Sequence, residues 1–234
     1  MKWQCVICSA ERRTRLRPAL CDCGALDSFL PAETAISKFE RASEIKTTPR
    51  KRYPTGDKEL DALLGGGFPA GALVLLWGRG GSGKSRCALR WATKMGNTLA
   101  LSLEMEKDEC IRSGLEAGAK LSNLLYTQDE ECELPARGVR CLVLDSISEC
   151  RDQEAMCARL KEWAQRTLGI VFMVCHATKA GQYKGPSTLQ HWGNGEIQVR
   201  ASKTKPGFAR VRFNKSRFCP LGAAFVPVVG LHAV

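Results

Sequence analysis

The sequence lacks any long apolar run. No stretch approaches the roughly 18 apolar residues that a membrane-spanning helix requires, so we expect no membrane partner. The first residues, from Met1 to Cys5, also lack the apolar centre of a secretion signal. Both absences favour a cytoplasmic protein. A chain of 234 residues is long enough for one α/β core with a small appendage.

Acidic residues are missing from the end of the sequence. No acidic residue follows Glu196. The whole chain has 35 lysines and arginines and a net charge of +11. The basic residues of this stretch are Arg200, Lys203, Lys205, Arg210, Arg212, Lys215 and Arg217. A one-sided basic region is typical of nucleic-acid binding, and a solubilising charged face is the alternative.

A glycine-rich stretch carries the strongest chemical signal. It consists of Gly78, Arg79, Gly80, Gly81, Ser82, Gly83, Lys84 and Ser85. This stretch matches the pattern G-x-x-x-x-G-K-[ST] and follows the apolar run 73–77, the expected context of a phosphate-binding loop. In such a loop the backbone amides surround phosphate oxygens. Lys84 would contact the β- and γ-phosphates, and the Ser85 hydroxyl would bind Mg²⁺. We therefore expect an NTP-binding protein.

Twelve cysteines would indicate disulfides in a secreted protein, but a nucleotide-binding loop favours a reducing compartment. Cys5 and Cys8 form one close pair, and Cys21 and Cys23 form a second. Four thiolates in two pairs can bind zinc tetrahedrally. The C-x-C spacing of the second pair makes Cys23 the least regular ligand. We predict a zinc knuckle at residues 1–28, a basic linker at 29–52 with a short helix at 33–44, and the core at 53–234.

The segment that opens the core resembles a known family. Residues 53–71 contain the pattern "TG…ELD…LGGG…PAG", which resembles the lead-in of RecA-fold ATPases and most of all the bacterial RadA (Sms) family of DNA repair and branch-migration proteins. The resemblance implies a RecA-like P-loop ATPase core, an α/β fold with a central, mostly parallel sheet. It extends as an order of motifs over roughly residues 1–230.

Three further positions follow buried strands. The run "SLEM" at 102–105 resembles replicative helicases of the same fold, in which the glutamate activates water. This makes Glu104 the expected base, with Glu106 as second choice and a helix-start carboxylate as the alternative. Asp145 ends the strand 140–146 and resembles the Walker B aspartate that holds Mg²⁺. His176 follows the strand 170–175, at the position where the RadA family has its γ-phosphate sensor; a structural histidine is the alternative.

The remaining motifs concern partners. Residues 180–184 are expected to form the loop that faces DNA in RecA-like proteins, with Tyr183 stacking on a base and Lys184 binding phosphate. Lys215 and Arg217 lie in "KSRFC", which resembles the RadA "KNRFG" signature with two substitutions. In related ring ATPases a Lys-x-Arg pair reaches the neighbouring subunit's nucleotide. DNA phosphate contacts or solvated charges are the alternatives.

These observations lead to one main hypothesis. We expect an ATPase that uses ATP, Mg²⁺ and structural Zn²⁺, forms a homo-oligomeric ring, most simply a hexamer, and acts on single-stranded or branched DNA, with replication or recombination proteins as further partners. Unlike the RadA family, the sequence shows no Lon-protease-like region after the ATPase, and the stretch after Asp145 leaves little room for a first DNA loop. The alternative is a regulator whose oligomer is ordered by nucleotide without motor activity. A small-molecule kinase is disfavoured.

Overall fold

The computed structural model describes residues 1–5, 7–8, 10–31, 49–178, 183 and 187–229. The chain divides into two compact units, Met1–Pro49 and Arg50–Val234. The predicted helix at 33–44 and most of the predicted DNA loop, including Lys184, lie outside the described residues. Within these residues, no helix has the length and apolarity to cross a membrane.

The N-terminal unit is a small antiparallel sheet. Strand β1 (Lys2–Cys5) pairs with β2 (Glu11–Arg13) on one side and with β3 (Phe29–Pro31) on the other. Phe29 is fully buried and packs with Cys5 and Cys21. Residues 29–31 therefore belong to this sheet rather than to the linker to which the sequence assigned them, because Phe29 supplies the apolar side chain that closes the small core.

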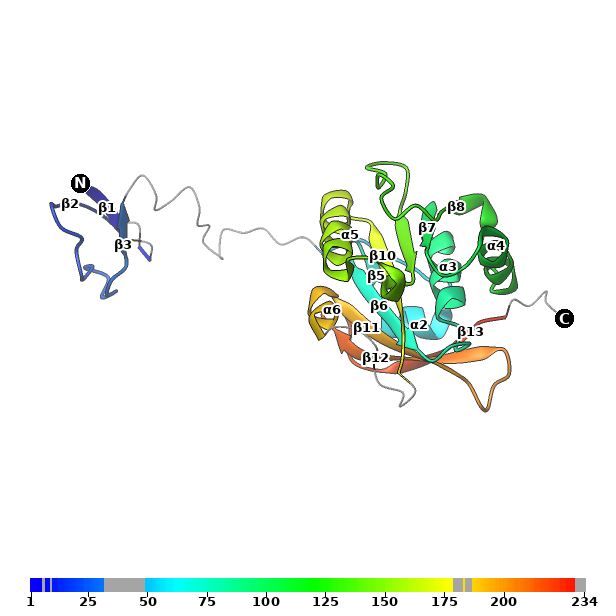
Figure 1. Cartoon of the computed structure of the whole chain (residues 1–234). Helices are drawn as coiled ribbons and strands as arrows, with labels where there is room; N and C mark the ends of the chain where they lie inside the picture. Colours follow the sequence, from blue (N-terminus) through cyan, green and yellow to red (C-terminus); the bar gives the residue numbers. More distant parts are fainter. Residues whose placement is uncertain (6, 9, 32–48, 179–182, 184–186, 230–234) are drawn as a thin grey trace. The chain divides into compact units, whose positions relative to one another are not determined.

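The second unit is built on one eight-stranded sheet with the order β13-β12-β11-β6-β10-β9-β7-β8 (Figure 1). In chain order, the first six strands of this sheet are β6 (Leu73–Gly78), β7 (Thr98–Ser102), β8 (Leu124–Thr127), β9 (Cys141–Asp145), β10 (Ile170–His176) and β11 (Gly195–Ala201). Their mutual pairings are all parallel. Strands β12 (Phe208–Ser216) and β13 (Ala223–Pro227) extend the sheet in antiparallel fashion. The expected mostly parallel α/β fold is confirmed.

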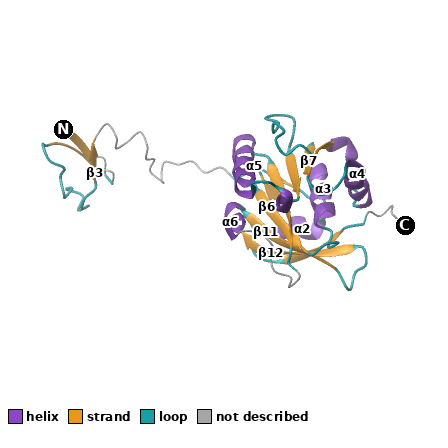
Figure 2. Cartoon of the chain, viewed as in Figure 1, coloured by secondary structure: helices purple, strands orange, loops and turns teal. Residues whose placement is uncertain are grey.

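Helices cover both faces of the parallel part of the sheet (Figure 2). The helices are α2 (Lys58–Leu63), α3 (Lys84–Met95), α4 (Lys107–Glu116), α5 (Gln153–Thr167) and α6 (Ser187–Trp192). Short 3₁₀ turns lie at Leu121–Asn123 and Ile147–Glu149, and β4 (Arg52–Tyr53) pairs with β5 (Phe68–Pro69). Successive residues of β6 enter different clusters: Val74 packs on the α3 side and Leu75 on the α5 side. Burial on both faces explains why these strands are continuous apolar runs.

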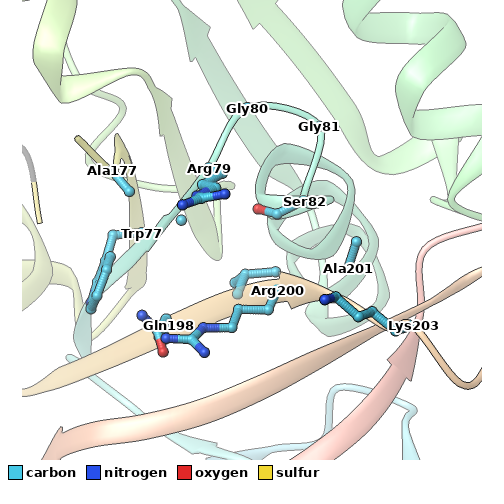
Figure 3. A pocket seen from close by; sticks show the side chains of 12 residues that line it. Trp77, Arg79, Gly80, Gly81, Ser82, Ala177, Gln198, Arg200, Ala201 and Lys203 are labelled. Carbon is cyan, nitrogen blue, oxygen red and sulfur yellow. The ribbon is translucent and has the colours of Figure 1, made fainter. Parts of the chain in front are cut away.

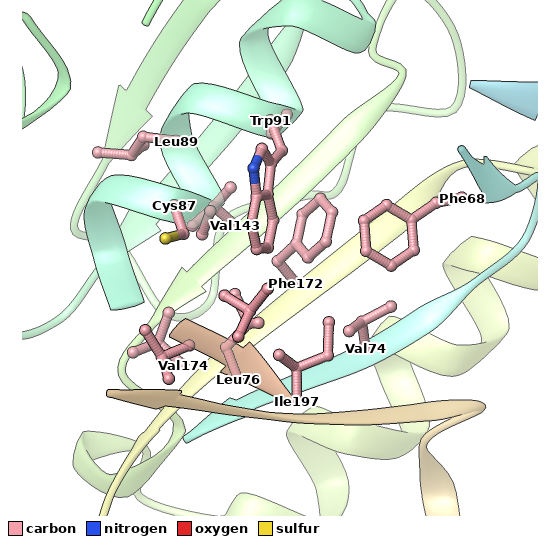
Figure 4. Packing of buried hydrophobic residues seen from close by; sticks show 14 of the residues in the cluster. Phe68, Val74, Leu76, Cys87, Leu89, Trp91, Val143, Phe172, Val174 and Ile197 are labelled. Carbon is pink, nitrogen blue, oxygen red and sulfur yellow. The ribbon is translucent and has the colours of Figure 1, made fainter. Parts of the chain in front are cut away.

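The lead-in segment is fixed to α3 by aromatic packing and by one buried charge. Phe68 lies against Trp91 and Phe172, with ring centroids 6.1 and 5.2 Å apart (Figure 4). Asp57 accepts hydrogen bonds from Arg90 at 2.8 Å and from the Trp91 indole at 2.7 Å. A buried carboxylate needs such partners to offset its desolvation. These contacts hold the helix that follows the glycine-rich loop.

Candidate functional site

The carboxyl ends of four parallel strands meet at one edge of the sheet. Ser102 of β7 pairs with Asp145 of β9, and His176 of β10 pairs with Gly78 of β6. The carbonyl of Asp145 also accepts hydrogen bonds from the backbone amides of Leu103 and Glu104, at 2.6 and 3.1 Å. In open α/β sheets this edge is where ligands bind. The structure thus brings together the loop, Glu104, Asp145 and His176, which lie far apart in sequence.

The glycine-rich loop connects β6 directly to α3, whose first residue is Lys84. Gly83 has a φ of 90°, a left-handed conformation that favours glycine, and a Cβ there would lie 2.7 Å from Val228. A Cβ on Gly78 would lie 2.2 Å from the carbonyl oxygen of Val199. The loop therefore requires glycine at these two positions. Its curled backbone and the start of α3 present amide groups suited to an anion.

Two opposite charges are buried beside this loop. Lys84 is only 5% exposed, its ammonium donates to the carbonyl of Arg79 at 3.0 Å, and burial lowers its pKa. Asp145 is 3% exposed, and burial raises the pKa of its carboxyl group to about 6. The neighbouring Ser85 hydroxyl and Lys84 ammonium oppose this rise in part, although neither carboxylate oxygen makes a hydrogen bond of good geometry. A buried carboxylate beside a hydroxyl group offers oxygen ligands suited to a hard cation such as Mg²⁺. The donor set therefore fits that ion.

Glu104 and His176 form a contact that the sequence did not predict. The Nε2 atom of His176 lies 2.8 Å from Oε2 of Glu104. The two side chains remain partly accessible, at 28% and 40% exposure. Glu106, the second choice for the base, is exposed and precedes α4, and the structure gives it no contact with His176. The pairing selects Glu104 as the carboxylate that a neighbouring group orients.

A cavity of about 590 Å³ lies between the glycine-rich loop and β11 (Figure 3). Arg79, Arg200 and Lys203 bring positive charge to its lining, which also includes Trp77 and Gln198. Sequence reasoning assigned Arg79 to the loop but placed nothing from β11 in the site. The available signal was the alternation of polar and apolar residues from 196 to 200, which the parallel pairing of β11 with β6 places beside the loop.

Tyr183 does not have the position expected of a base-stacking residue. Its ring packs edge-on against Trp77, with centroids 6.3 Å apart, and its hydroxyl group is buried. The backbone of Tyr183 bridges Ala177. This aromatic side chain therefore packs against the apolar cluster on the α5 side of the sheet, and the expectation that it stacks on DNA is wrong for this structure.

Lys215 and Arg217 lie near the other end of the sheet. Strand β12 runs antiparallel, so Lys215 pairs with Glu196, which pairs in turn with Leu75 in the first half of β6. The Lys215 ammonium donates to the carbonyl of Gln190 in α6. Arg217 is exposed, and its backbone amide donates to Asn194 at 2.9 Å. Neither residue lines the cavity beside its own glycine-rich loop.

The N-terminal unit contains a four-cysteine cluster. The sulfur atoms of Cys5, Cys8, Cys21 and Cys23 all lie within 4.8 Å of one another. Cys5 and Cys23 are 3.9 Å apart, and Cys8 and Cys21 are 3.4 Å apart. Tetrahedral zinc with bonds of about 2.3 Å requires sulfur separations of about 3.8 Å, so the cluster fits the ion. The hydroxyl of Ser28 lowers the pKa of the Cys5 thiol to about 6, which favours the thiolate that zinc binds. Cys23, despite its irregular spacing, lies inside this group.

We predict one zinc ion per chain in purified, freshly reduced protein, measured by metal analysis. A Cys5→Ser/Cys8→Ser variant should lose the metal while the core stays folded, because the two units have separate apolar clusters. Cys132→Ser, a change outside the cluster, should retain it. Well under one equivalent of zinc in the unmodified protein would contradict the assignment.

The buried carboxyl of Asp145 predicts a stability change in the protein without nucleotide or magnesium. Because its pKa is raised from 3.8 to about 6 on folding, the folded state binds more protons between these values, and the free energy of unfolding falls as pH rises through them. Asp145→Asn should therefore be more stable than the unmodified chain at pH 7.5, by up to about 3 kcal/mol.

Urea denaturation at pH 7.5 and pH 5.0 checks this sign. The advantage of Asp145→Asn should shrink at the lower pH, where the wild-type carboxyl is largely protonated in the folded state. Asp129→Asn, which alters an exposed carboxylate, should change stability by less than about 0.5 kcal/mol at either pH. A destabilised Asp145→Asn at pH 7.5 would show that the ionised carboxylate is stabilised in the folded chain.

Comparison with known proteins finds relatives named as the DNA repair protein RadA. No protein-family model matches the chain. The DNA repair protein RadA of Salmonella typhimurium is 28% identical over 245 residues, which cover 93% of this chain and 53% of that protein. RadA of Escherichia coli is 27% identical with the same coverage. RadA of Haemophilus influenzae is 30% identical over 203 residues, or 78% of this chain and 44% of that protein. The chain spans about half the length of the curated relatives it matches.

Solved structures support the fold. The RadB recombinase superimposes with a TM-score of 0.57 at 20% identity, covering 74% of this chain and 94% of that structure. The KaiC-like protein PH0186 from Pyrococcus horikoshii superimposes with a TM-score of 0.60 at 18% identity, covering 76% of this chain and 94% of that structure. At these identities the likeness concerns the fold alone. The chain is thus a homologue of the bacterial DNA repair protein RadA, with a RecA-like core and an N-terminal four-cysteine cluster.

Proposed function

We propose that this protein is a DNA-dependent ATPase of the RadA/RecA type that acts in recombination, repair or replication. One observation carries the proposal: a buried lysine, a buried carboxylate beside the Ser85 hydroxyl and a partly exposed glutamate converge beside a glycine-rich loop. ATP hydrolysis needs these three groups to neutralise phosphate charge, hold a metal ion and activate water.

In this proposal each residue has a distinct task. The amides of the loop and the Lys84 ammonium bind the β- and γ-phosphates. The Ser85 hydroxyl and the Asp145 carboxylate would hold Mg²⁺, which when bound neutralises charge on the phosphates. Glu104 takes a proton from the attacking water. Residues on separate strands perform these tasks because the strands end at one edge.

His176 links the base to the nucleotide. Its hydrogen bond to Glu104 fixes the direction of the carboxylate, as a third group does for the base of other hydrolytic sites. His176 is also the last residue of β10 and precedes the segment 179–186. We infer that His176 exchanges Glu104 for the γ-phosphate when ATP binds, which makes it both a positioning residue and a sensor.

DNA is the proposed macromolecular partner. The matched relatives are named DNA repair proteins, and the region after Glu196 carries only basic charges. Glu104 beside His176 favours hydrolysis over an oligomer that is merely ordered by nucleotide. Measurement of turnover separates these two functions, since only the first requires an activated water.

We predict that single-stranded DNA stimulates ATP turnover. Lys84→Ala should abolish nucleotide binding or turnover, because it removes the ammonium group that is proposed to bind the β- and γ-phosphates. Glu104→Gln should bind ATP normally and hydrolyse it at least ~10²-fold more slowly, in line with loss of a general base. Phosphate release and binding of a fluorescent ATP analogue measure the two steps.

Glu106→Gln is the matched control and should retain turnover, because Glu106 has no described contact with His176. Normal hydrolysis by Glu104→Gln would show that Glu104 is not the general base. Tight ATP binding without turnover in the unmodified protein, with or without DNA, would favour the regulatory alternative.

A homo-oligomeric ring, most simply a hexamer, is the proposed assembly. Lys215 and Arg217 are distant in strand register from the loop of their own chain, and Arg217 is exposed. This placement supports a role for Arg217 at the nucleotide of an adjacent subunit, where a cation neutralises charge that develops on the γ-phosphate. Lys215, already bonded to α6, would position this segment.

Mixing of variant subunits tests this assembly. Arg217→Ala should lose turnover without DNA and still bind ATP. When it is mixed with Lys84→Ala subunits, which retain Arg217 but have a defective pocket, part of the activity should return. If Arg217→Ala keeps its basal turnover and mixing changes nothing, Arg217 contacts DNA or solvent instead. The DNA alternative would appear as lost stimulation with a shallower salt dependence.

A further inference from the structure

The outer face of strands β11 and β12 is uncovered at its basic end. Along β12, Ala209, Val211 and Phe213 enter the buried cluster on the α3 side. Because side chains alternate along a strand, Phe208, Arg210 and Arg212 point to the opposite face. Arg210 and Arg212 are exposed, and Phe208 is 37% exposed. This face therefore presents charge and an aromatic ring to solvent.

Three arginines gather there through the register of the two strands. Arg200 of β11 pairs directly with Arg210, and Gln198 pairs with Arg212. The side chains of Gln198, Arg200, Arg210 and Arg212 line one small groove. Directly paired residues such as Arg200 and Arg210 lie about 5 Å apart at Cβ, and diagonal neighbours such as Arg200 and Arg212 lie about 7–8 Å apart. We call Arg200, Arg210 and Arg212 the arginine platform.

The charges of the platform are not neutralised within the chain. None of its three guanidinium groups has a hydrogen bond or ion pair in the described part of the protein. Two carboxylates of the described residues lie nearby: Glu196 on β11, and Glu59 of α2, which contacts the neighbouring strand β13; both accept hydrogen bonds from other groups. Glu196 accepts from the Trp77 indole at 2.7 Å, and Glu59 accepts from the backbone amide of Phe225 at 3.1 Å. Like charges on neighbouring strands destabilise a sheet, so this arrangement indicates an anionic ligand.

Further features narrow the class of ligand. Lys205 places a cation 4.7 Å from the ring of Phe225, which pairs with Arg210 across β12 and β13. Phe208 lies on β12 beside Arg210, with part of its ring accessible. Cations along a strand with an interleaved aromatic side chain match a nucleic acid whose bases are unpaired, because phosphates and base faces are bound together.

We propose that the arginine platform and Phe208 form a binding surface for single-stranded DNA. The proposal rests on the proposed function and adds a location to it. Arg200 also borders the cavity beside the glycine-rich loop, so this surface adjoins the nucleotide site. A strand bound there contacts the same β-strand that forms the wall of that cavity.

Binding of fluorescent oligo-dT at several salt concentrations tests the proposal. Arg210→Ala/Arg212→Ala should bind at least ~10-fold more weakly near 50 mM salt, and the slope of log K against log salt should fall by about 1.4, or 0.7 for each lost phosphate contact. Phe208→Ala should weaken binding several-fold with an unchanged slope, because it removes stacking and no charge. Arg200 is left intact because it borders the cavity.

Arg112→Ala/Arg137→Ala is the matched control. It removes two exposed arginines, one in α4 and one in the loop before β9, and should leave affinity and slope unchanged. Basal ATP turnover should be unchanged in all three variants. Wild-type oligo-dT binding by Arg210→Ala/Arg212→Ala would overturn the proposal. Failure of that variant to assemble, with normal DNA binding by its subunits, would identify a subunit interface and also overturn it.

Two outcomes separate this inference from the proposed function. Loss of oligo-dT binding in the platform variants, with no DNA-stimulated turnover in the unmodified protein, would support the platform and refute the ATPase proposal. DNA-stimulated turnover that survives in Arg210→Ala/Arg212→Ala would support the ATPase proposal and refute the platform. Equal loss of heparin and oligo-dT binding, with no effect of Phe208→Ala, would indicate a general anion surface and overturn the claim of single-stranded DNA.

Discussion

The buried carboxylate of Asp145 is the constraint around which the core is organised. An ionised carboxylate in an apolar interior is unfavourable unless a donor or a cation offsets its desolvation. Here the neighbouring Ser85 and Lys84 offset it only in part, and burial still raises the pKa of the group to about 6. The apolar strands on either side of β9 maintain this environment. A divalent ion would satisfy the carboxylate, so the fold keeps a local instability at the place where the proposed chemistry requires a ligand.

The surroundings of this site are rigid for identifiable reasons. The glycine-rich loop lies too close to Val199 and Val228 to accept side chains at Gly78 and Gly83. The helix that follows is fixed through Asp57, which bonds both Arg90 and Trp91. Since Asp57 belongs to the lead-in segment, the chain before the loop determines where the loop ends. Preorganised amides and a fixed Lys84 need little rearrangement when phosphate binds.

The structure distributes charge to different parts of the sheet. Groups suited to phosphate chemistry lie at the carboxyl ends of the parallel strands. Lys215 and Arg217 lie toward the opposite ends, because β12 reverses the chain direction. The arginine platform lies on the outer face of β11 and β12, next to the cavity wall.

The sequence by itself determined the loop, the strand that precedes it and the mostly parallel sheet, because apolar periodicity and a fixed glycine spacing are local properties. It also identified the four cysteines, whose pairing in sequence limits how far apart they can lie. Only the tertiary structure paired His176 with Glu104, since 72 residues separate them and the contact depends on strand order. It likewise placed Tyr183 against Trp77 instead of in solvent, and joined Phe29 to the cysteine unit. The arginine platform was visible in sequence only as scattered basic residues. Cross-strand register decides which of them share a face, and register is a property of the whole sheet.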